Sequence, residues 1–208
     1  MLNFISVGLT LIFISSPWWS LAFSFLTIIL FNYAFDPVLY LFFMSAFIAP
    51  GLFCWIYSFG ILVYPKTKIR IIIPYFIICL IYESLLIFFL FTNPDIIAVY
   101  EGKFSYRRTW FNIAFLVFVI ATTIITGGIF AIKSISSENS IVRWKGIFFS
   151  NAIISFVLAS VLDVFSVGNS VLQIITKIIF IAIGIEYCLG FFLPNRLTIA
   201  LTGEKSLD

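Results

Sequence analysis

Residues 143–194 read RWKGIFFSNAIISFVLASVLDVFSVGNSVLQIITKIIFIAIGIEYCLGFFLP. Two long apolar stretches in this segment are joined by the short uncharged turn Gly168-Asn169-Ser170. A helix needs roughly 20 consecutive apolar residues to cross the hydrocarbon core of a bilayer. The segment therefore predicts two membrane-spanning helices connected by a tight turn.

The composition extends this interpretation to the whole chain. Hydrophobic residues make up 62% of the sequence and charged residues 10%, and the mean hydropathy is +1.18. Soluble domains average about 45–50% apolar and about 25% charged residues, because their surfaces need polar side chains. We expect an all-α, polytopic transmembrane helix bundle whose partner is the lipid bilayer. The net charge of +3 is too small to indicate a nucleic-acid surface.

The apolar stretches predict about six spans in one integral membrane domain, residues 1–208. The first is long and contains Pro17, which should kink it, although two half-helices around Trp18-Trp19 are an alternative. Asp36-Pro37 is a helix-start signal, and Pro50-Gly51 predicts a kink in the second span. Ser137 or Asn139 is expected to cap the fifth span. The predicted spans are 3–31, 38–64, 71–91, 110–132, 144–165 and 171–193, followed by a short cytoplasmic tail, 195–208.

The basic residues predict the orientation of these spans. If the spans alternate, eight of the twelve Lys and Arg residues fall on one side, and short basic loops mark the cytoplasm. We therefore expect a multi-pass protein of the cell membrane with both termini in the cytoplasm. The polar segment 92–109 opposes this assignment, because Lys103, Arg107 and Arg108 lie on the other side.

Two ionisable residues lie close to the turn at 168–170. Asp163 is near the end of the fifth span, and Lys177 is near the start of the sixth. The hairpin places them at similar depth, so we expect a neutralising Asp163–Lys177 pair, either as a structural lock or as a contact site for a ligand or ion.

Two further carboxyl groups lie deeper in predicted spans. Glu83 is near the middle of the third span, and Glu186 is in the inner half of the sixth. Neither has a basic residue three or four positions away on its own helix. Each could belong to a polar cavity or a proton-linked site, or each could form a hydrogen bond in helix packing. Gly127-Gly128 is more typical of close helix packing than of a binding site.

Catalytic chemistry has little support in the sequence. The chain contains no His, and Cys54, Cys79 and Cys188 all lie in apolar stretches, where thiols are usually inert. Their spacing does not predict a zinc site. We therefore expect no catalytic residues, no metal and no cofactor. We also expect that the protein is not an enzyme.

Several short motifs resemble those of a known group of proteins. They are Pro17-Trp18-Trp19, Phe91-Thr92-Asn93-Pro94, the region from Gly127 through Ser134 and Ser137 to Arg143-Trp144-Lys145-Gly146, Leu162-Asp163, and Ile185-Glu186-Tyr187-Cys188-Leu189-Gly190-Phe191-Phe192-Leu193-Pro194. Together they resemble a group of uncharacterised archaeal multi-span membrane proteins. That group is distantly similar to the seven-span sensor region N-terminal to some histidine kinases.

The resemblance implies that Asp163 and Glu186 fall on recurring positions of the group. The chain departs from it by lacking a first span and by carrying no output domain after Pro194. A sensor-like or scaffold module would then need a separate cytoplasmic or membrane signalling partner. The alternative is a small proton- or cation-linked transporter or channel that uses Glu83 and Glu186.

Overall fold

The computed structural model describes the backbone of residues 2–33, 35–102, 105–165 and 170–203. Side chains are described for the same residues except 2–4, 101, 102, 105, 161, 163–165, 170 and 173. The chain divides into two compact units, Met1–Ala121 and Thr122–Asp208. Six helices in the described ranges are long and apolar enough to cross a membrane. The predicted all-helical transmembrane bundle with six spans is therefore confirmed.

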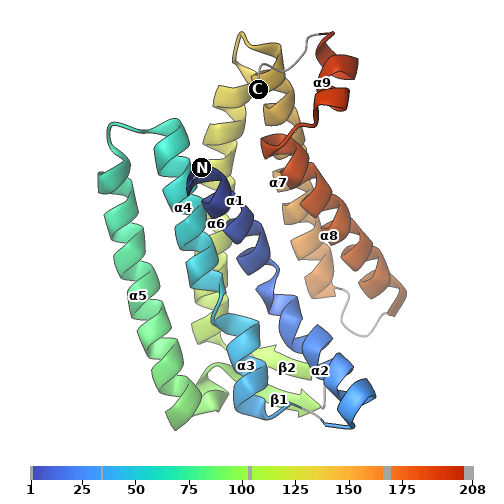
Figure 1. Ribbon diagram of the computed structural model, residues 1–208. Coiled ribbons are helices and arrows are strands. Elements are labelled where there is room, and N and C mark those ends of the chain that lie inside the picture. Colours follow the sequence, from blue (N-terminus) through green and yellow to red (C-terminus); the bar gives the residue numbers. More distant parts are fainter. Residues whose placement is uncertain (1, 34, 103–104, 166–169, 204–208) are drawn as a thin grey trace. The chain divides into compact units, whose positions relative to one another are not determined.

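The first span is one long, bent helix (Figure 1). It consists of α1 (Leu2–Ile14), the 3₁₀ turn η1 (Ser16–Trp18) and α2 (Trp19–Phe31), and it bends by 35°. Pro17 lies in η1, where its missing N–H and its ring disrupt the α-helical hydrogen bonds. The predicted kink is confirmed, and the span continues beyond it as a second helical segment.

The second span is also interrupted. Asp36 caps α3 (Pro37–Ser45) by accepting a hydrogen bond from the backbone N–H of Val38 at 3.0 Å. A turn at residues 46 and 47 then separates α3 from α4 (Ile48–Val63). The break lies one turn before Pro50 because a proline ring clashes with the carbonyl four residues earlier, here that of Ala46. The predicted kink is therefore present, displaced toward the N-terminus.

The third span, α5 (Lys68–Thr92), packs against α4, which also packs against α1. These three segments lie side by side in Figure 1. After α5, the short turn η2 (Pro94–Ile96) leads into an antiparallel hairpin of β1 (Ala98–Gly102) and β2 (Ser105–Arg108). The sequence predicted only a polar segment here. The hairpin is found at the end of the first unit where α5 ends and α3 begins (Figure 1).

The remaining helices are α6 (Trp110–Ile135), α7 (Ser140–Phe165), α8 (Ser170–Phe191) and α9 (Asn195–Thr202). Asn139 caps α7, since its Oδ1 accepts hydrogen bonds from the N–H groups of Ile141 and Val142. The predicted cap is thereby confirmed for Asn139. The polar tail begins with α9, a short helix that the sequence did not predict.

The second unit is held together by close helix approach. A Cβ atom at Gly190 would lie 2.9 Å from the Cβ of Phe149, and one at Gly146 would lie 2.8 Å from the backbone nitrogen of Ile135. Glycine allows two helix backbones to approach this closely. Of the predicted packing pair, Gly127 faces Ile153, whereas Gly128 has no neighbouring atoms within 4 Å of an added Cβ.

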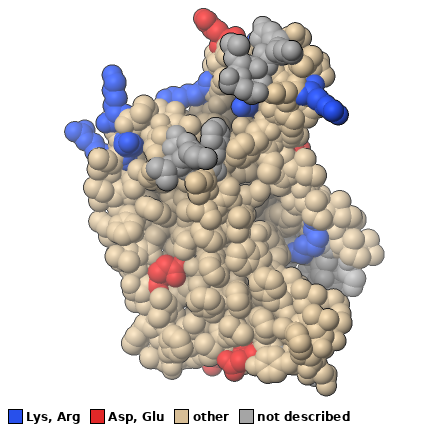
Figure 2. All heavy atoms as spheres, in the orientation of Figure 1, with Lys and Arg blue, Asp and Glu red and all other residues tan. Residues whose placement is uncertain are grey.

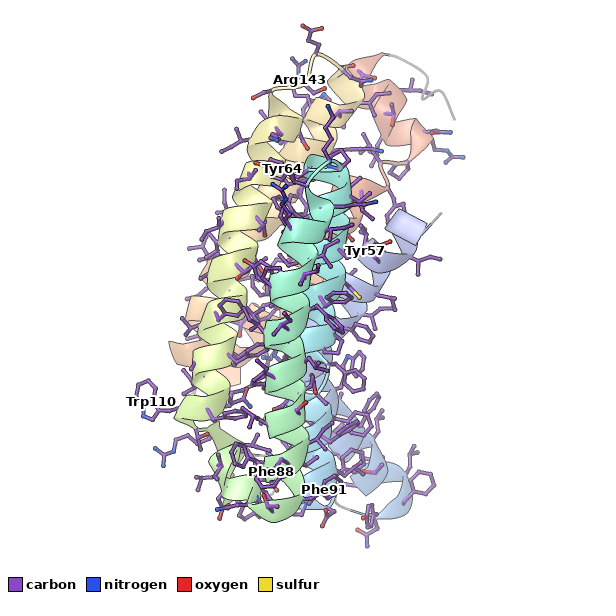
Figure 3. All side chains as sticks on the ribbon, turned by 90° about the vertical axis from the view of Figure 1, so that its left-hand side faces the viewer. Tyr57, Tyr64, Phe88, Phe91, Trp110 and Arg143 are labelled. Atoms are coloured by element: carbon purple, nitrogen blue, oxygen red, sulfur yellow. The ribbon has the colours of Figure 1, made fainter. Side chains whose placement is uncertain are left out.

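The surface of the first unit fits a lipid environment. Helix α5 exposes a long series of apolar side chains, including Ile73 and Ile81. Phe88, Phe91 and Trp110 point outward near one end, as Figure 3 shows, and Trp110 is 83% exposed. Trp side chains gather at membrane interfaces in this way, and exposed Phe side chains are suited to contact with lipid. Basic side chains instead gather at the turn between α4 and α5, at the other end of the unit (Figure 2).

Candidate functional site

Glu83 lies within the third span, as predicted. It is 15 residues after Lys68 and nine before Thr92, so it lies about 22 Å and about 14 Å along the axis from the two ends of α5. The side chain is half-buried, and its Oε1 atom is buried without a hydrogen-bond partner among the described residues.

Glu186 lies on α8 in the second unit. It is also half-buried, and its Oε2 atom has no hydrogen-bond partner in the described part of the chain. The next residue, Tyr187, packs its ring against Phe149 and Phe191 at 5.7 and 5.1 Å between centroids. Glu186 therefore lies beside an aromatic cluster of the second unit.

The predicted Asp163–Lys177 pair remains a prediction. The side chain of Asp163 lies outside the described residues. Lys177 is half-buried, and its Nζ atom lies 5.7 Å from the centroid of the Phe180 ring, within the range of a cation–π interaction. Lys177 and Glu186 are nine residues apart on α8, or about 14 Å along the axis, so the helix does not bring them together.

A buried polar cluster in the first unit brings together residues that the sequence did not predict to form a site. We call it the Asn112 cluster; it comprises Ser45, Tyr82, Arg108 and Asn112. The fully buried Asn112 donates from Nδ2 to the Ser45 hydroxyl at 2.8 Å. Its Oδ1 accepts longer hydrogen bonds, from the Tyr82 hydroxyl at 3.5 Å and from the Arg108 guanidinium at 3.4 Å. One amide thus connects α3, α5, β2 and α6.

Aromatic stacking holds Tyr82 in place. Its ring lies parallel to those of Phe115 and Phe111, with centroid distances of 3.6 and 5.4 Å. Phe111 and Phe115 are four residues apart, so they lie one above the other on the same face of α6. Asn112 lies on the same side of α6, since Tyr82 of α5 stacks on the two Phe rings and also donates a hydrogen bond to Asn112.

The hairpin positions Arg108 within the Asn112 cluster. The Thr109 hydroxyl donates to the carbonyl groups of Ile96 and Ile97, which fixes the base of the hairpin. Ile97 is fully buried, and the ring of Tyr106 stacks on that of Tyr40 in α3, with centroids 4.6 Å apart. Burial raises the pKa of Tyr106 above its ordinary value, with neighbouring Tyr100, Tyr40 and Asp36 adding to the shift. The Tyr106 ring thus packs the hairpin against α3.

The first span contributes a line of buried hydroxyl groups to the same unit. The Ser6 and Ser58 hydroxyls lie 2.7 Å apart, and the Thr10 hydroxyl donates to the carbonyl of Ser6. The buried hydroxyl residues of this span are Ser6, Thr10, Ser16, Ser20 and Ser24. Polar side chains facing the interior and apolar ones facing outward are what a lipid environment favours.

The polar groups of the first unit supply hydrogen-bond donors and acceptors. The Asn112 cluster contains one cationic group, an amide and two hydroxyls, and a guanidinium is a residue type that commonly binds carboxylates or phosphates. The described residues contain no group of three or more His, Cys, Asp or Glu side chains that could hold a metal ion.

Two signals in the sequence could have pointed to the buried hydroxyls of the first span and to the hairpin. Ser16, Ser20 and Ser24 recur every four residues, which places them on one helix face. Gly102 separates two short runs of strand-forming residues, which is a hairpin pattern. The partners of Asn112 come from distant parts of the chain, so no local pattern reveals them.

No protein-family model matches the chain, and no curated protein or solved structure is significantly similar to it.

Proposed function

We propose that the chain is a sensor-like membrane module without an enzymatic activity of its own. The observation that carries this proposal is the Asn112 cluster, in which one buried amide connects the hairpin to three helices. A change at the hairpin therefore has a direct physical route into the helices. In this proposal the hairpin end lies outside, and the termini and the α4–α5 turn lie in the cytoplasm.

The ligand is a molecule with a carboxylate or phosphate group that binds the Arg108 guanidinium. Such a ligand would draw Arg108 away from the Asn112 amide, because a guanidinium bonds an anionic oxygen more strongly than it bonds the neutral amide oxygen of Asn112 at 3.4 Å. Asn112 in turn holds Ser45, the last residue of α3 before the break in the second span. The break gives α3 and α4 room to change their mutual angle.

The opposite end of the first unit offers a surface for a signalling partner. Lys66, Lys68 and Arg70 are all exposed on and beside the α4–α5 turn. Basic loops of this kind attract acidic protein surfaces and anionic lipid headgroups. A separate cytoplasmic or membrane protein that binds this turn would then receive the signal.

A small proton- or cation-linked transporter or channel is the second candidate. It is favoured by the buried Oε1 atom of Glu83 near the middle of α5, which has no hydrogen-bond partner in the part of the chain that the structure describes. Ionisable groups at this depth commonly mark ion or proton pathways.

The sensor-like role is tested by replacing Arg108 and observing the opposite end of the unit. A bimane label is attached at Lys66→Cys in full-length protein in nanodiscs, with Cys54, Cys79 and Cys188 replaced by serine. Arg108→Gln removes the guanidinium that a ligand would draw away from Asn112, and it should shift the bimane emission. Arg107→Gln, the adjacent exposed arginine, is the matched control and should leave it unchanged. Identical spectra for the Arg108 variant and the parent would contradict the proposal.

A further inference from the structure

Two neighbouring spans of the first unit are interrupted at the same place. The turn η1 separates α1 from α2, and the turn at residues 46 and 47 separates α3 from α4. The rings of Phe13 and Phe47 stack with centroids 5.7 Å apart, and an added Cβ at Gly51 would lie 3.0 Å from the Cβ of Phe13. The two breaks therefore lie side by side. Paired discontinuous helices form ion and substrate sites in membrane proteins because unwound backbone frees polar groups.

Each break is associated with a proline that removes a backbone donor. In a continuous α-helix, residues 17 and 50 would donate to the carbonyl groups of Phe13 and Ala46. Pro17 and Pro50 have no N–H, so both carbonyl groups lack their α-helical donor. Backbone oxygens at this depth need another partner, since lipid offers none.

The hydroxyl of Ser16 lies at the first break and has no hydrogen-bond partner among the described residues. Ser16 is fully buried, and its Oγ atom forms no hydrogen bond with any residue that the structure describes. Its element, η1, packs against α3, which ends at the second break. Ser20, one helical turn further, is also buried and lies close to the Tyr40 hydroxyl. A buried hydroxyl without a partner is unusual in a folded protein and points to a bound group.

We propose that the paired breaks bind a monovalent cation, with the Ser16 hydroxyl and the carbonyl groups of Phe13 and Ala46 as ligands. All three are neutral oxygens. Divalent cations such as Ca²⁺ and Mg²⁺ are bound mainly through carboxylates, whereas carbonyl oxygens replace the hydration shell of Na⁺ or K⁺. α1 and α3 end at the breaks, and α2 and α4 begin there. The partial negative charges of the two helix C-termini and the partial positive charges of the two N-termini therefore nearly cancel. The oxygen ligands then decide that the site binds a cation. The site goes beyond the sensor-like role and does not depend on it.

The experiment measures the thermal stability of the full chain in nanodiscs at constant ionic strength. NaCl and KCl are each compared with N-methyl-D-glucamine chloride, whose organic cation is much larger than Na⁺ or K⁺. A ligand that binds only the folded state raises Tm in a saturable manner. We expect such a rise with Na⁺ or K⁺. Ser16→Ala should weaken binding and raise the half-saturating cation concentration at least about tenfold. Sodium NMR relaxation on the same samples gives an independent readout of binding.

Two further variants make the result specific. Ser84→Ala removes an exposed hydroxyl that donates to the Leu80 carbonyl, and it should leave the cation response unchanged. Pro50→Ala restores an N–H that can bond the Ala46 carbonyl, and it should weaken the response even if Ser16→Ala fails to fold. A wild-type Tm that is the same with all three cations would overturn the proposal. So would a cation response that survives unchanged in Ser16→Ala or in Pro50→Ala.

Discussion

The interiors of the two units are built from different chemistry. In the first unit, buried hydroxyls and the Asn112 amide form hydrogen bonds between helices, as at Ser6–Ser58 and Asn112–Ser45. In the second unit, Ala152, Ala159 and Ile183 form the core of α7 and α8. Helices in lipid can associate through either interhelical hydrogen bonds or close packing of small residues. The difference indicates that packing holds the second unit together, while the first unit adds hydrogen bonds between helices to its packing.

The largest effect is expected where packing is closest, at Gly146. Gly146→Ala places a Cβ atom 2.7 Å from the Cβ of Ser134 and 2.8 Å from the backbone nitrogen of Ile135. Backbone cannot yield as a flexible side chain does, so we expect a loss of about 3 kcal/mol in the free energy of unfolding. Denaturant unfolding in detergent micelles measures it.

Gly128→Ala is the matched control, because an added Cβ there meets nothing within 4 Å. It should be neutral or stabilising by up to about 1 kcal/mol, since alanine has the higher helix propensity. Equal losses from both substitutions would show that close packing at Gly146 does not stabilise the second unit.

The next effect is expected at Asn112. Asn112→Ala leaves the buried Ser45 hydroxyl and the Arg108 guanidinium without this partner, and it should lower the free energy of unfolding by about 2 kcal/mol. Asn93→Ala, at an exposed asparagine of the same unit, should change it by less than about 0.5 kcal/mol. Comparable effects from the two substitutions would contradict a stabilising role for the Asn112 cluster.

A smaller effect separates hydrogen bonding from stacking at Tyr82. Tyr82→Phe removes only the long hydrogen bond to Asn112 and should cost about 0.5 kcal/mol. Tyr82→Leu also removes the stack with Phe111 and Phe115 and should cost about 1–2 kcal/mol more. Thermal unfolding of both variants in the same detergent gives the comparison. A Tyr82→Phe variant as unstable as Tyr82→Leu would mean that the hydroxyl, not the ring, holds this position.

The smallest effect concerns the pH dependence of the hairpin. Burial raises the pKa of Tyr106, so the folded state holds its proton more tightly than the unfolded state. The stability that this tighter proton binding contributes is fully present below the pKa of Tyr106 in the unfolded state, about 10. It is lost as the pH rises through the pKa of Tyr106 in the folded state. Unfolding measured from pH 8 to 11 should show a loss of stability above about pH 10 that is smaller in Tyr106→Phe. An identical pH dependence in both proteins would contradict this role of Tyr106.

Local patterns in the sequence predict much of the fold. Apolar length sets the six spans, Pro17 and Pro50 set the two breaks, and Asp36 and Asn139 cap helices as their residue types predict. Each of these signals acts over a few residues or one span.

The Asn112 cluster could not be predicted in this way. Ser45 and Asn112 are 67 residues apart, and Tyr82 and Asn112 are 30 apart. A serine or an asparagine within an apolar stretch has the same local pattern whether it faces lipid or a partner. Only the packing of the helices decides which polar residues meet.

Flux through the protein tests the sensor-like role most directly. Proton and cation flux is measured in proteoliposomes that contain wild-type protein or Glu83→Gln, with protein-free vesicles as the baseline. A module that binds without transporting should give no flux above this baseline in either case. Flux in the wild type that Glu83→Gln abolishes would contradict the sensor-like role and establish Glu83 as the central residue of a transport pathway.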